Sequence, residues 1–190
     1  MYIYKKEYMI KFVEDTCTNY QHRTFMNIEL SDLTLIFVRD ISTAGEKCTL
    51  NYCKVCQKDP YIFILNASGR LCSTYSEILE KLSKYIQKHN ITSLNIAGNG
   101  IYTFNKDGIT QERVNDLVYN VLHYLIESGC NIQKVRSGGQ TGADEAGLVA
   151  GERLGLETTS LCPKGWRFRT ANGEDIQDEQ AYKARFKNIN

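Results

Sequence analysis

The amino-acid sequence predicts a three-layer α/β fold, in which helices cover both faces of a parallel sheet. Short, continuously apolar runs alternate with longer segments of helical periodicity, and strands that are apolar on both faces are typical of a buried parallel sheet. The 190 residues suffice for one well-packed domain, and no linker or low-complexity tract divides them. We therefore expect a single domain over residues 1–190, with ligands bound at the carboxyl ends of the strands.

The apolar runs and the helical patterns give the expected order of elements. Strands are predicted at 33–38, 61–65, 93–97, 132–137 and 158–162, and residues 1–12 alternate apolar and polar side chains like a further strand. Helices are predicted near 14–28, 46–57, 75–89, 110–129, 143–154 and 178–188. The clearest of them has Thr110 as its N-cap and Gly129 at its C-terminal stop.

Composition excludes several classes of function. A formal net charge of +1 gives no general attraction to nucleic acid, so any affinity for anions must be local. No apolar run approaches the ~20 residues that cross a bilayer, and no signal-peptide pattern opens the chain. We expect a cytoplasmic protein with no membrane partner and no specific nucleic-acid partner.

The cysteines agree with a reducing compartment. Their odd number, seven, favours free thiols. Cys53 and Cys56 form a lone C-x-x-C, while the three histidines stand alone in the sequence, so no metal site is indicated. The pair is interpreted either as a redox pair or, preferably, as small apolar side chains packed on a helix.

The most informative segment is the loop S-G-G-Q-T-G-A-D, which lies between the strand at 132–137 and the helix at 143–154. At such a junction backbone N–H groups converge on a bound anion, and glycines let the backbone approach it. The loop matches neither the Walker motif nor G-x-G-x-x-G, and the alternative is a tight turn with Asp144 as a plain helix cap. Its candidate ligand-binding residues are Ser137, Gly138, Gly139, Gln140, Thr141, Gly142 and Asp144.

Three further loops follow predicted strands. In C-P-K-G-W-R-F (162–168), Lys164 and Arg167 supply charge, Gly165 a turn and Trp166 an aromatic face; the alternative is a basic surface loop with Trp166 folded over the core. In S-T-A-G-E-K-C-T (42–49), Thr43 and Gly45 precede a helix, and the alternative is a capping box. The loop A-G-N-G (97–100) is the fourth. Because a parallel sheet gathers such strand ends on one edge, one shared site is expected.

These motifs resemble a known family. S-G-G-Q-T-G-A-D-E-A-G-L, C-P-K-G-W-R and N-G-E-D-I, spread over roughly residues 132–176, are similar to the start of the molybdenum-cofactor carrier family. That family belongs to the SLOG superfamily of Rossmann-like nucleotide-binding proteins, which also contains cytokinin-activating phosphoribohydrolases and sensors of nucleotide-derived signals. The resemblance implies a Rossmann-like fold, a phosphorylated nucleotide-like or pterin ligand, and a homo-oligomer, dimeric or higher.

The order of the motifs indicates a circular permutation. In that family a segment Y-x-x-R-T-x-x-N follows the glycine motif, whereas its counterpart here, Y-Q-H-R-T-F-M-N, precedes it at 20–27. The resemblance makes residues 14–65 the permuted partner half and brings Arg23 to the opposite lip of the site. The family's Gly-Thr turn reads here as Ala44-Gly45-Glu46, so one phosphate-binding hydroxyl is expected to be missing. A weak echo, Y-K-A-R-F-K-N-I at 182–189, is interpreted as a remnant, a helix paired with a neighbouring subunit, or coincidence.

Three functions remain open at this level. The favoured one is a protein that binds a phosphorylated nucleotide-like molecule (a nucleotide, a cyclic or ADP-ribose-type signal, or a molybdopterin-type cofactor) and sequesters or carries it. The alternative is a hydrolase that cleaves an N-glycosidic or phosphate bond with Asp144 or Glu46 as acid or base, although the phosphoribohydrolase motif P-G-G-x-G-T-x-x-E is absent. The third is a partner-binding module that has lost the pocket.

Overall fold

The structure, a computed structural model, describes residues 10–71, 75–187 and 189. Within them six strands form one sheet in the order β1-β6-β5-β4-β2-β3, and each neighbouring pair is parallel. The strands are β1 (Lys11–Glu14), β2 (Leu33–Val38), β3 (Tyr61–Ile64), β4 (Ser93–Gly98), β5 (Lys134–Ser137) and β6 (Glu157–Cys162). The predicted parallel sheet is confirmed, and all six side chains of β2 are buried, as its unbroken apolar run requires.

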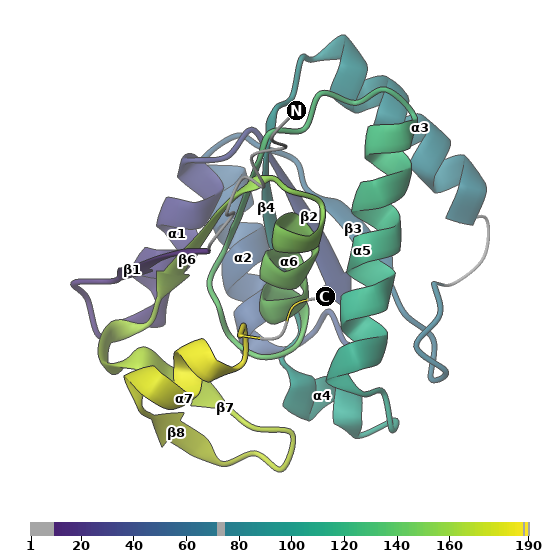
Figure 1. Ribbon diagram of the computed structural model, residues 1–190. Helices are drawn as coiled ribbons and strands as arrows, with labels where there is room; N and C mark the ends of the chain where they lie inside the picture. The colour runs from purple at the N-terminus through teal and green to yellow at the C-terminus, as the bar shows by residue number, and fades with distance from the viewer. Residues whose placement is uncertain (1–9, 72–74, 188, 190) are drawn as a thin grey trace, which may run out of the picture.

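Helices cover both faces of this sheet, which confirms the predicted three-layer, Rossmann-like α/β fold (Figure 1). The helices α1 and α2 lie behind the sheet in that view, whereas α5 and α6 lie in front of it and α3 packs beside α5. Their bounds are α1 (Tyr20–Glu29), α2 (Ala44–Val55), α3 (Tyr75–Lys88), α5 (Gln111–Glu127) and α6 (Ala143–Arg153).

The longest helix, α5, forms for the reasons that its sequence indicates. Five side chains of its apolar stripe are buried and belong to the main hydrophobic core, which is built mainly from the sheet and from α3, α5 and α6. The Thr110 hydroxyl accepts the backbone N–H of Arg113 (3.3 Å), and Gly129 stops the helix with φ of +84°. The N-cap residue, the apolar stripe and the terminating glycine of α5 are thus at the positions that the sequence predicts.

Helix α1 begins later than expected. The sequence predicts a helix near 14–28, but Glu14 is still in β1 and the Asp15 N–H continues the pairing with β6 by donating to the Cys162 carbonyl (2.8 Å). The helix starts at Tyr20, after Asn19 has capped it by accepting the Gln21 N–H (2.9 Å). Most of the N-terminal strand predicted over 1–12 lies outside the described residues.

Four small elements near the strand ends were not predicted, and a fifth is shorter than expected. Arg167–Arg169 (β7) and Asp175–Gln177 (β8) form an antiparallel hairpin after the 3-10 turn η1 (Lys164–Trp166). Helix α4 (Ile101–Asn105) follows β4 directly. Helix α7 is confined to Glu179–Ala184 within the longer segment predicted at 178–188. All of these lie at the carboxyl ends of the sheet strands, in the lower part of Figure 1.

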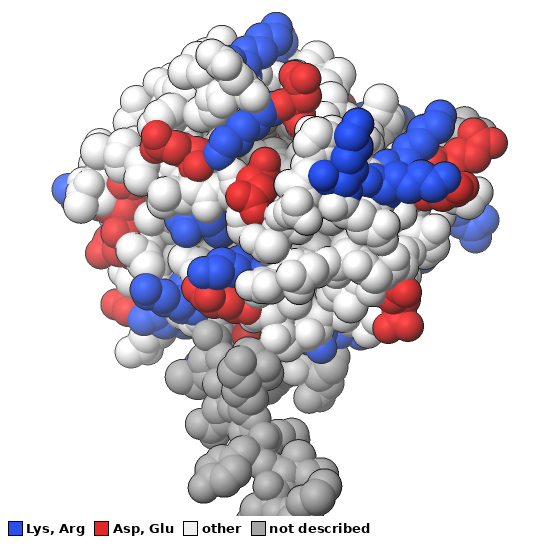
Figure 2. All heavy atoms as spheres, turned by 90° about the horizontal axis from the view of Figure 1, so that it is seen from above, with Lys and Arg blue, Asp and Glu red and all other residues white. Residues whose placement is uncertain are grey.

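The buried Cys53 thiol, the surface charge and the helix lengths do not distinguish between the candidate functions. The six cysteines in the described part of the chain are free, and Cys72 lies outside it. Cys53 is buried in α2, and burial raises the pKa of its thiol to about 11, as expected of a cysteine packed like an apolar side chain. Basic and acidic side chains are interspersed over the face shown in Figure 2. Among the described residues, no helix combines the length and the apolar character needed to span a membrane.

Candidate functional site

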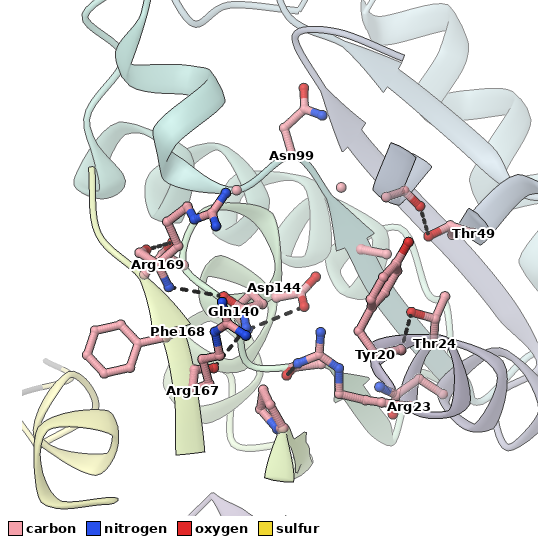
Figure 3. A pocket seen from close by; sticks show the side chains of 18 of the residues that line it. Tyr20, Arg23, Thr24, Thr49, Asn99, Gln140, Asp144, Arg167, Phe168 and Arg169 are labelled. Atoms are coloured by element: carbon pink, nitrogen blue, oxygen red, sulfur yellow. Dashed lines mark hydrogen bonds between the residues drawn. The ribbon is translucent and has the colours of Figure 1, made fainter. Parts of the chain in front are cut away.

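A cavity of about 710 Å³ opens at the carboxyl ends of five sheet strands (Figure 3). All four loops that the sequence singled out contribute to its lining, after β2, β4, β5 and β6. The loop after β1 and the first turns of α1 complete it. This volume is in the usual range for small-molecule sites, and the position follows the rule for open α/β sheets.

The cavity brings together nine of the fourteen residues predicted to bind a ligand. They are Arg23, Thr43, Gly45, Gly138, Gln140, Thr141, Asp144, Lys164 and Arg167. The segments that hold them are far apart in sequence, and it is the parallel sheet that gathers them. The five others do not line it: Ser137, Gly139, Gly142, Gly165 and Trp166.

Two of the five have structural contacts that explain their positions. The Ser137 side chain is fully buried, and its hydroxyl donates to the Ile96 carbonyl (2.7 Å), which ties β5 to β4. The Trp166 ring packs edge-on against Tyr182, with ring centroids 5.5 Å apart. Trp166 therefore covers a small second core, as the alternative interpretation of its loop predicts.

The other three are glycines whose neighbours are protein atoms. A methyl group on Gly139 (φ +68°) would lie 1.6 Å from the Tyr182 hydroxyl, and one on Gly142 (φ +86°) would lie 2.3 Å from the Asn99 carbonyl oxygen. Gly165 (φ +74°) similarly faces the amide of Gln177, at 2.2 Å. The need for glycine at these positions comes from packing and from the left-handed backbone.

The amino end of α6, the expected anion site, is partly occupied by the protein itself. The Gly142 N–H donates to the Gln111 side chain (2.6 Å), and the Ala143 N–H donates to the Asn99 carbonyl (3.0 Å). The Thr141 hydroxyl donates to the Arg169 carbonyl (2.6 Å). These donors hold the loop in shape, so they are not free to receive an anion in this conformation.

The amino end of α2 is more open. Thr43 is its N-cap residue, but its side chain makes no capping hydrogen bond. The loop therefore does not form the capping box that was its alternative interpretation. A methyl group on Gly45 would have Thr43 Oγ1, 4.0 Å away, as its nearest neighbour. Thr43 to Glu46 all line the cavity. A helix start with uncapped N–H groups is a favourable place for negative charge.

Arg23 links α1 to the glycine loop by a hydrogen bond. It is 7% exposed, and its Nη1 donates to the Gly138 carbonyl (2.6 Å). Figure 3 shows it reaching from α1 towards the segment that carries Gln140 and Asp144. Arg185 makes a parallel contact from the far end of the chain by donating to the Gly139 carbonyl (2.8 Å). The motif at 20–27 and its echo at 182–189 thus hold consecutive carbonyls of one loop.

Two polar atoms of α1 are buried without a protein partner. Among the described residues, the Nε of Arg23 and the Oδ1 of Asn27 have no hydrogen-bond partner, although both residues line the cavity. Asn27 is 3% exposed. Buried polar atoms are almost always hydrogen-bonded, because an unpaired one costs about 1–3 kcal/mol. Arg23 and Asn27 thus place an unpaired donor and an unpaired acceptor beside the cavity.

Two carboxyl groups of the cavity have raised pKa values. Burial, with a smaller contribution from the charge of Asp144, raises the pKa of Glu46 to about 7. Burial also raises the pKa of Asp144 to about 6, against the opposing effect of Arg23. Both acids therefore exchange protons near neutral pH, the range in which acid–base catalysis is efficient.

The cations of the cavity differ in how far they are already paired. Arg167 and Arg169 both bind the Asp175 carboxylate, which lowers the pKa of that acid. Lys164 is exposed at the cavity wall, and the described residues offer it no ion pair. It is thus the lining cation most available to a ligand.

Several lining residues were missed or only half recognised from the sequence. Asn27 belongs to the Y-x-x-R-T-x-x-N segment and Asn99 to the A-G-N-G loop, yet neither was predicted to bind a ligand. Asp15 and Cys17 precede α1 and carry no recognisable pattern. Only the pairing of β1 with β6 brings these two into the cavity.

Fold and site together define a Rossmann-like α/β protein with its cavity at the strand ends. Residues 3–120 match the Circularly permutated YpsA SLOG family, and the chain belongs to this family. The membership confirms the predicted SLOG relationship and the permuted order of the motifs.

Similarity to other known proteins is limited. A crystal structure of a protein from Syntrophus aciditrophicus SB, named as a molybdenum carrier, aligns at 23% identity and a TM-score of 0.37 over 60% of this chain. The alignment spans 62% of the length of that protein. No curated protein sequence matches this chain significantly.

Proposed function

We propose that the strand-end cavity binds a phosphorylated, nucleotide-like small molecule, and that the protein acts by holding it, as a carrier or sequestering protein. The observation that carries the proposal is that two buried atoms, Arg23 Nε and Asn27 Oδ1, have no hydrogen-bond partner in the protein. A donor beside an acceptor fits a ribose, a base edge or a pterin, each of which offers both hydrogen-bonding roles. The Asn27 oxygen does not suit a phosphate, since both would be acceptors.

The phosphate end is assigned to the start of α2 and to the loop after β6. The uncapped start of α2, with Thr43 and Gly45, offers backbone N–H groups, while Lys164 and Arg167 offer charge. Gly138 and Gln140 also line the cavity. The sequence predicts that the glycine loop holds the phosphate. We propose a different position because the N–H groups of Gly142 and Ala143 already donate to protein atoms.

The direct test is to identify what the protein carries. Freshly purified protein is denatured and the released molecules are analysed by mass spectrometry. The emptied protein is then titrated with nucleoside mono- and diphosphates, ADP-ribose, cyclic nucleotides and a phosphorylated pterin while its thermal unfolding is followed. We expect one class to raise the unfolding temperature. Absence of any released molecule and of any shift would refute the proposal.

Asn27→Leu provides a variant that separates binding from folding. Leucine has a similar volume and removes an oxygen that has no partner in the protein. The free variant should be at least as stable as the wild type, because an unsatisfied buried group is removed. Its ligand-induced shift should be lost. An unchanged shift would exclude Asn27 from the site.

A second candidate function is hydrolysis of an N-glycosidic bond in such a ligand. It is favoured by the raised pKa values of Glu46 (about 7) and Asp144 (about 6) in one cavity. A protonated Glu46 can donate a proton to a leaving base, while an ionised Asp144 can accept one from water.

The two functions differ in what happens to the ligand. The wild type is incubated with nucleoside monophosphates and NAD-type dinucleotides, and released base is measured by chromatography. Glu46→Gln should abolish release and retain binding if the protein is a hydrolase. Binding without release in the wild type would exclude the hydrolase and leave the carrier.

A further inference from the structure

We infer that Asp15, Cys17 and His22 form a binding site for one divalent transition-metal ion of the zinc type at the rim of the cavity. Their carboxylate oxygen, sulfur and ring nitrogen lie within 4.8 Å of one another. This inference does not rest on the proposed ligand, because binding of the metal alone is what it claims.

The geometry of the three ligands suits a shared ion. His22 Nδ1 lies 2.9 Å from Asp15 Oδ1 and 3.1 Å from Oδ2. Around a tetrahedral ion with bonds of about 2.0–2.3 Å, ligand atoms are separated by about 3.3–3.8 Å. The present separations, from 2.9 Å up to the 4.8 Å limit, bracket that range, so small rotations of the side chains suffice to surround an ion.

The backbone holds the three ligands before any ion binds. Asp15 is fixed by the bond from its N–H to the Cys162 carbonyl at the end of the sheet. His22 lies in the first turn of α1, whose start is fixed by Asn19. The Cys17 N–H donates to Asp15 Oδ1 (3.0 Å), which turns the intervening chain back towards the carboxylate. The end of the sheet, the turn and the helix thus bring the three ligand side chains together.

The charge balance also calls for a cation. The Asp15 side chain is 2% exposed, and among the described residues its one ion-pair partner is His22, whose side chain is 43% exposed. A buried carboxylate needs positive charge beside it. A divalent ion bound by Asp15 and the Cys17 thiolate would supply that charge with a neutral histidine as third ligand.

The ligand types select the metal and leave a place for chemistry. Thiolate and imidazole favour zinc over magnesium or calcium, which prefer oxygen ligands. Three protein ligands leave a fourth tetrahedral position, as in catalytic zinc sites. Asp15 and Cys17 line the cavity, so the ion would lie at its wall, and a water molecule or a ligand oxygen would take the fourth position.

The sequence indicates no metal site, because Cys53-x-x-Cys56 has no second ligand pair. The actual cluster has the spacing D-x-C-x4-H, in which residues 15 and 17 belong to a loop and residue 22 to a helix. The histidine that stands alone in the sequence is brought to the other two only by the fold.

The test uses the full-length protein without a histidine tag, stripped with a chelator. Zinc affinity is measured by competition with a chromogenic chelator, and cobalt is added as a spectroscopic substitute. We expect one zinc ion per chain and a thiolate-to-cobalt charge-transfer band. Cys17→Ser and His22→Gln should each weaken zinc binding at least about a hundredfold, and Cys17→Ser should remove the band.

Cys48→Ser is the matched control, since Cys48 is a half-exposed thiol on α2 outside the cluster. It should bind zinc and cobalt like the wild type. Circular dichroism checks that all variants fold, which the exposure of Cys17 and His22 favours. Failure of the wild type to bind zinc stoichiometrically, or equal affinity in Cys17→Ser and His22→Gln, would overturn the inference.

Discussion

The Tyr182 hydroxyl fills the space beside the α-carbon of Gly139. It lies 3.1 Å from the Ser160 hydroxyl, and the three residues meet behind the glycine loop. Gly139 is therefore required by a side chain more than forty positions away in the sequence. The glycine loop depends on α7 for its shape as well as on the neighbouring strands.

Gly139→Ala should lower the free energy of unfolding by about 3 kcal/mol or more. The new methyl group would lie 1.6 Å from the Tyr182 oxygen, and the backbone has φ of +68°, so both a clash and backbone strain must be relieved. Urea unfolding measures the loss. Gly108→Ala is the control, because Gly108 has a similar φ of +72° but no atom within 4 Å of a methyl group. It should cost only about 1 kcal/mol.

Asn99 joins the loops after β2 and β4, and Asn99→Ala should destabilise the fold by about 2–4 kcal/mol. Its Oδ1 accepts the N–H groups of Arg39 (2.7 Å) and Asp40 (2.8 Å), and its Nδ2 donates to the Asp40 carbonyl (2.9 Å). The residue is 1% exposed, and the variant removes three hydrogen bonds that tie the loop after β2 to the loop after β4. Denaturant unfolding of Asn99→Ala beside Asn131→Ala, an exposed position, tests this. Equal stabilities would contradict it.

Glu46 should make the stability of the protein fall as the pH rises. Its pKa is raised from 4.5 to about 7, so the folded state keeps a proton that the unfolded state loses. The stability associated with neutral Glu46 is complete below about pH 4.5 and is lost as the pH rises through about 7. Glu46→Gln lacks this titration. Its stability relative to the wild type should therefore increase by about 2–3 kcal/mol between pH 4.5 and 8.

The control for this pH dependence is Glu77→Gln, a change on the exposed side of α3. Unfolding in urea is measured at pH 4.5, 6 and 8 for the wild type and both variants. The difference between Glu77→Gln and the wild type should stay constant. A constant difference for Glu46→Gln as well would show that folding does not raise the pKa of Glu46.

The sequence predicted the sheet and its covering helices because each depends on local periodicity. The run at 33–38 and the stripe of α5 are apolar in the pattern that their burial demands. The rule that ligands bind at strand ends then located the cavity. The hairpin of β7 and β8 was missed, since three-residue strands are too short to show a period.

Local patterns could not show what each glycine makes room for. Gly45 has open space beside it, whereas Gly138 accommodates the Asp144 carboxylate, Gly139 the Tyr182 hydroxyl and Gly142 the Asn99 carbonyl. All four look alike in the sequence, because the group that a side chain at Gly139 or Gly142 would meet comes from a different part of the chain. The same limit applies to Asp15 and His22, which meet only after β1 has joined the edge of the sheet.

Lys164→Ala should weaken binding of a phosphorylated ligand about ten- to a hundredfold. Lys164 lines the cavity together with Thr43 and Gly45 and has no ion pair among the described residues. A charge-assisted contact to phosphate is worth about 1.5–3 kcal/mol, which corresponds to that range of affinity. Because Lys164 is exposed, stability should hardly change. Titration calorimetry with the nucleotide identified by mass spectrometry measures the affinity.

Salt dependence distinguishes this charge from a general effect of net charge. Added salt should weaken the wild type more than Lys164→Ala, because screening acts on the interaction that the variant lacks. Lys81→Ala removes the same charge from the exposed surface of α3, far from the cavity lining, and should behave like the wild type. If Lys164→Ala instead matches the wild type in affinity at both low and high salt, Lys164 is a solvated lysine and the phosphate must lie elsewhere in the cavity.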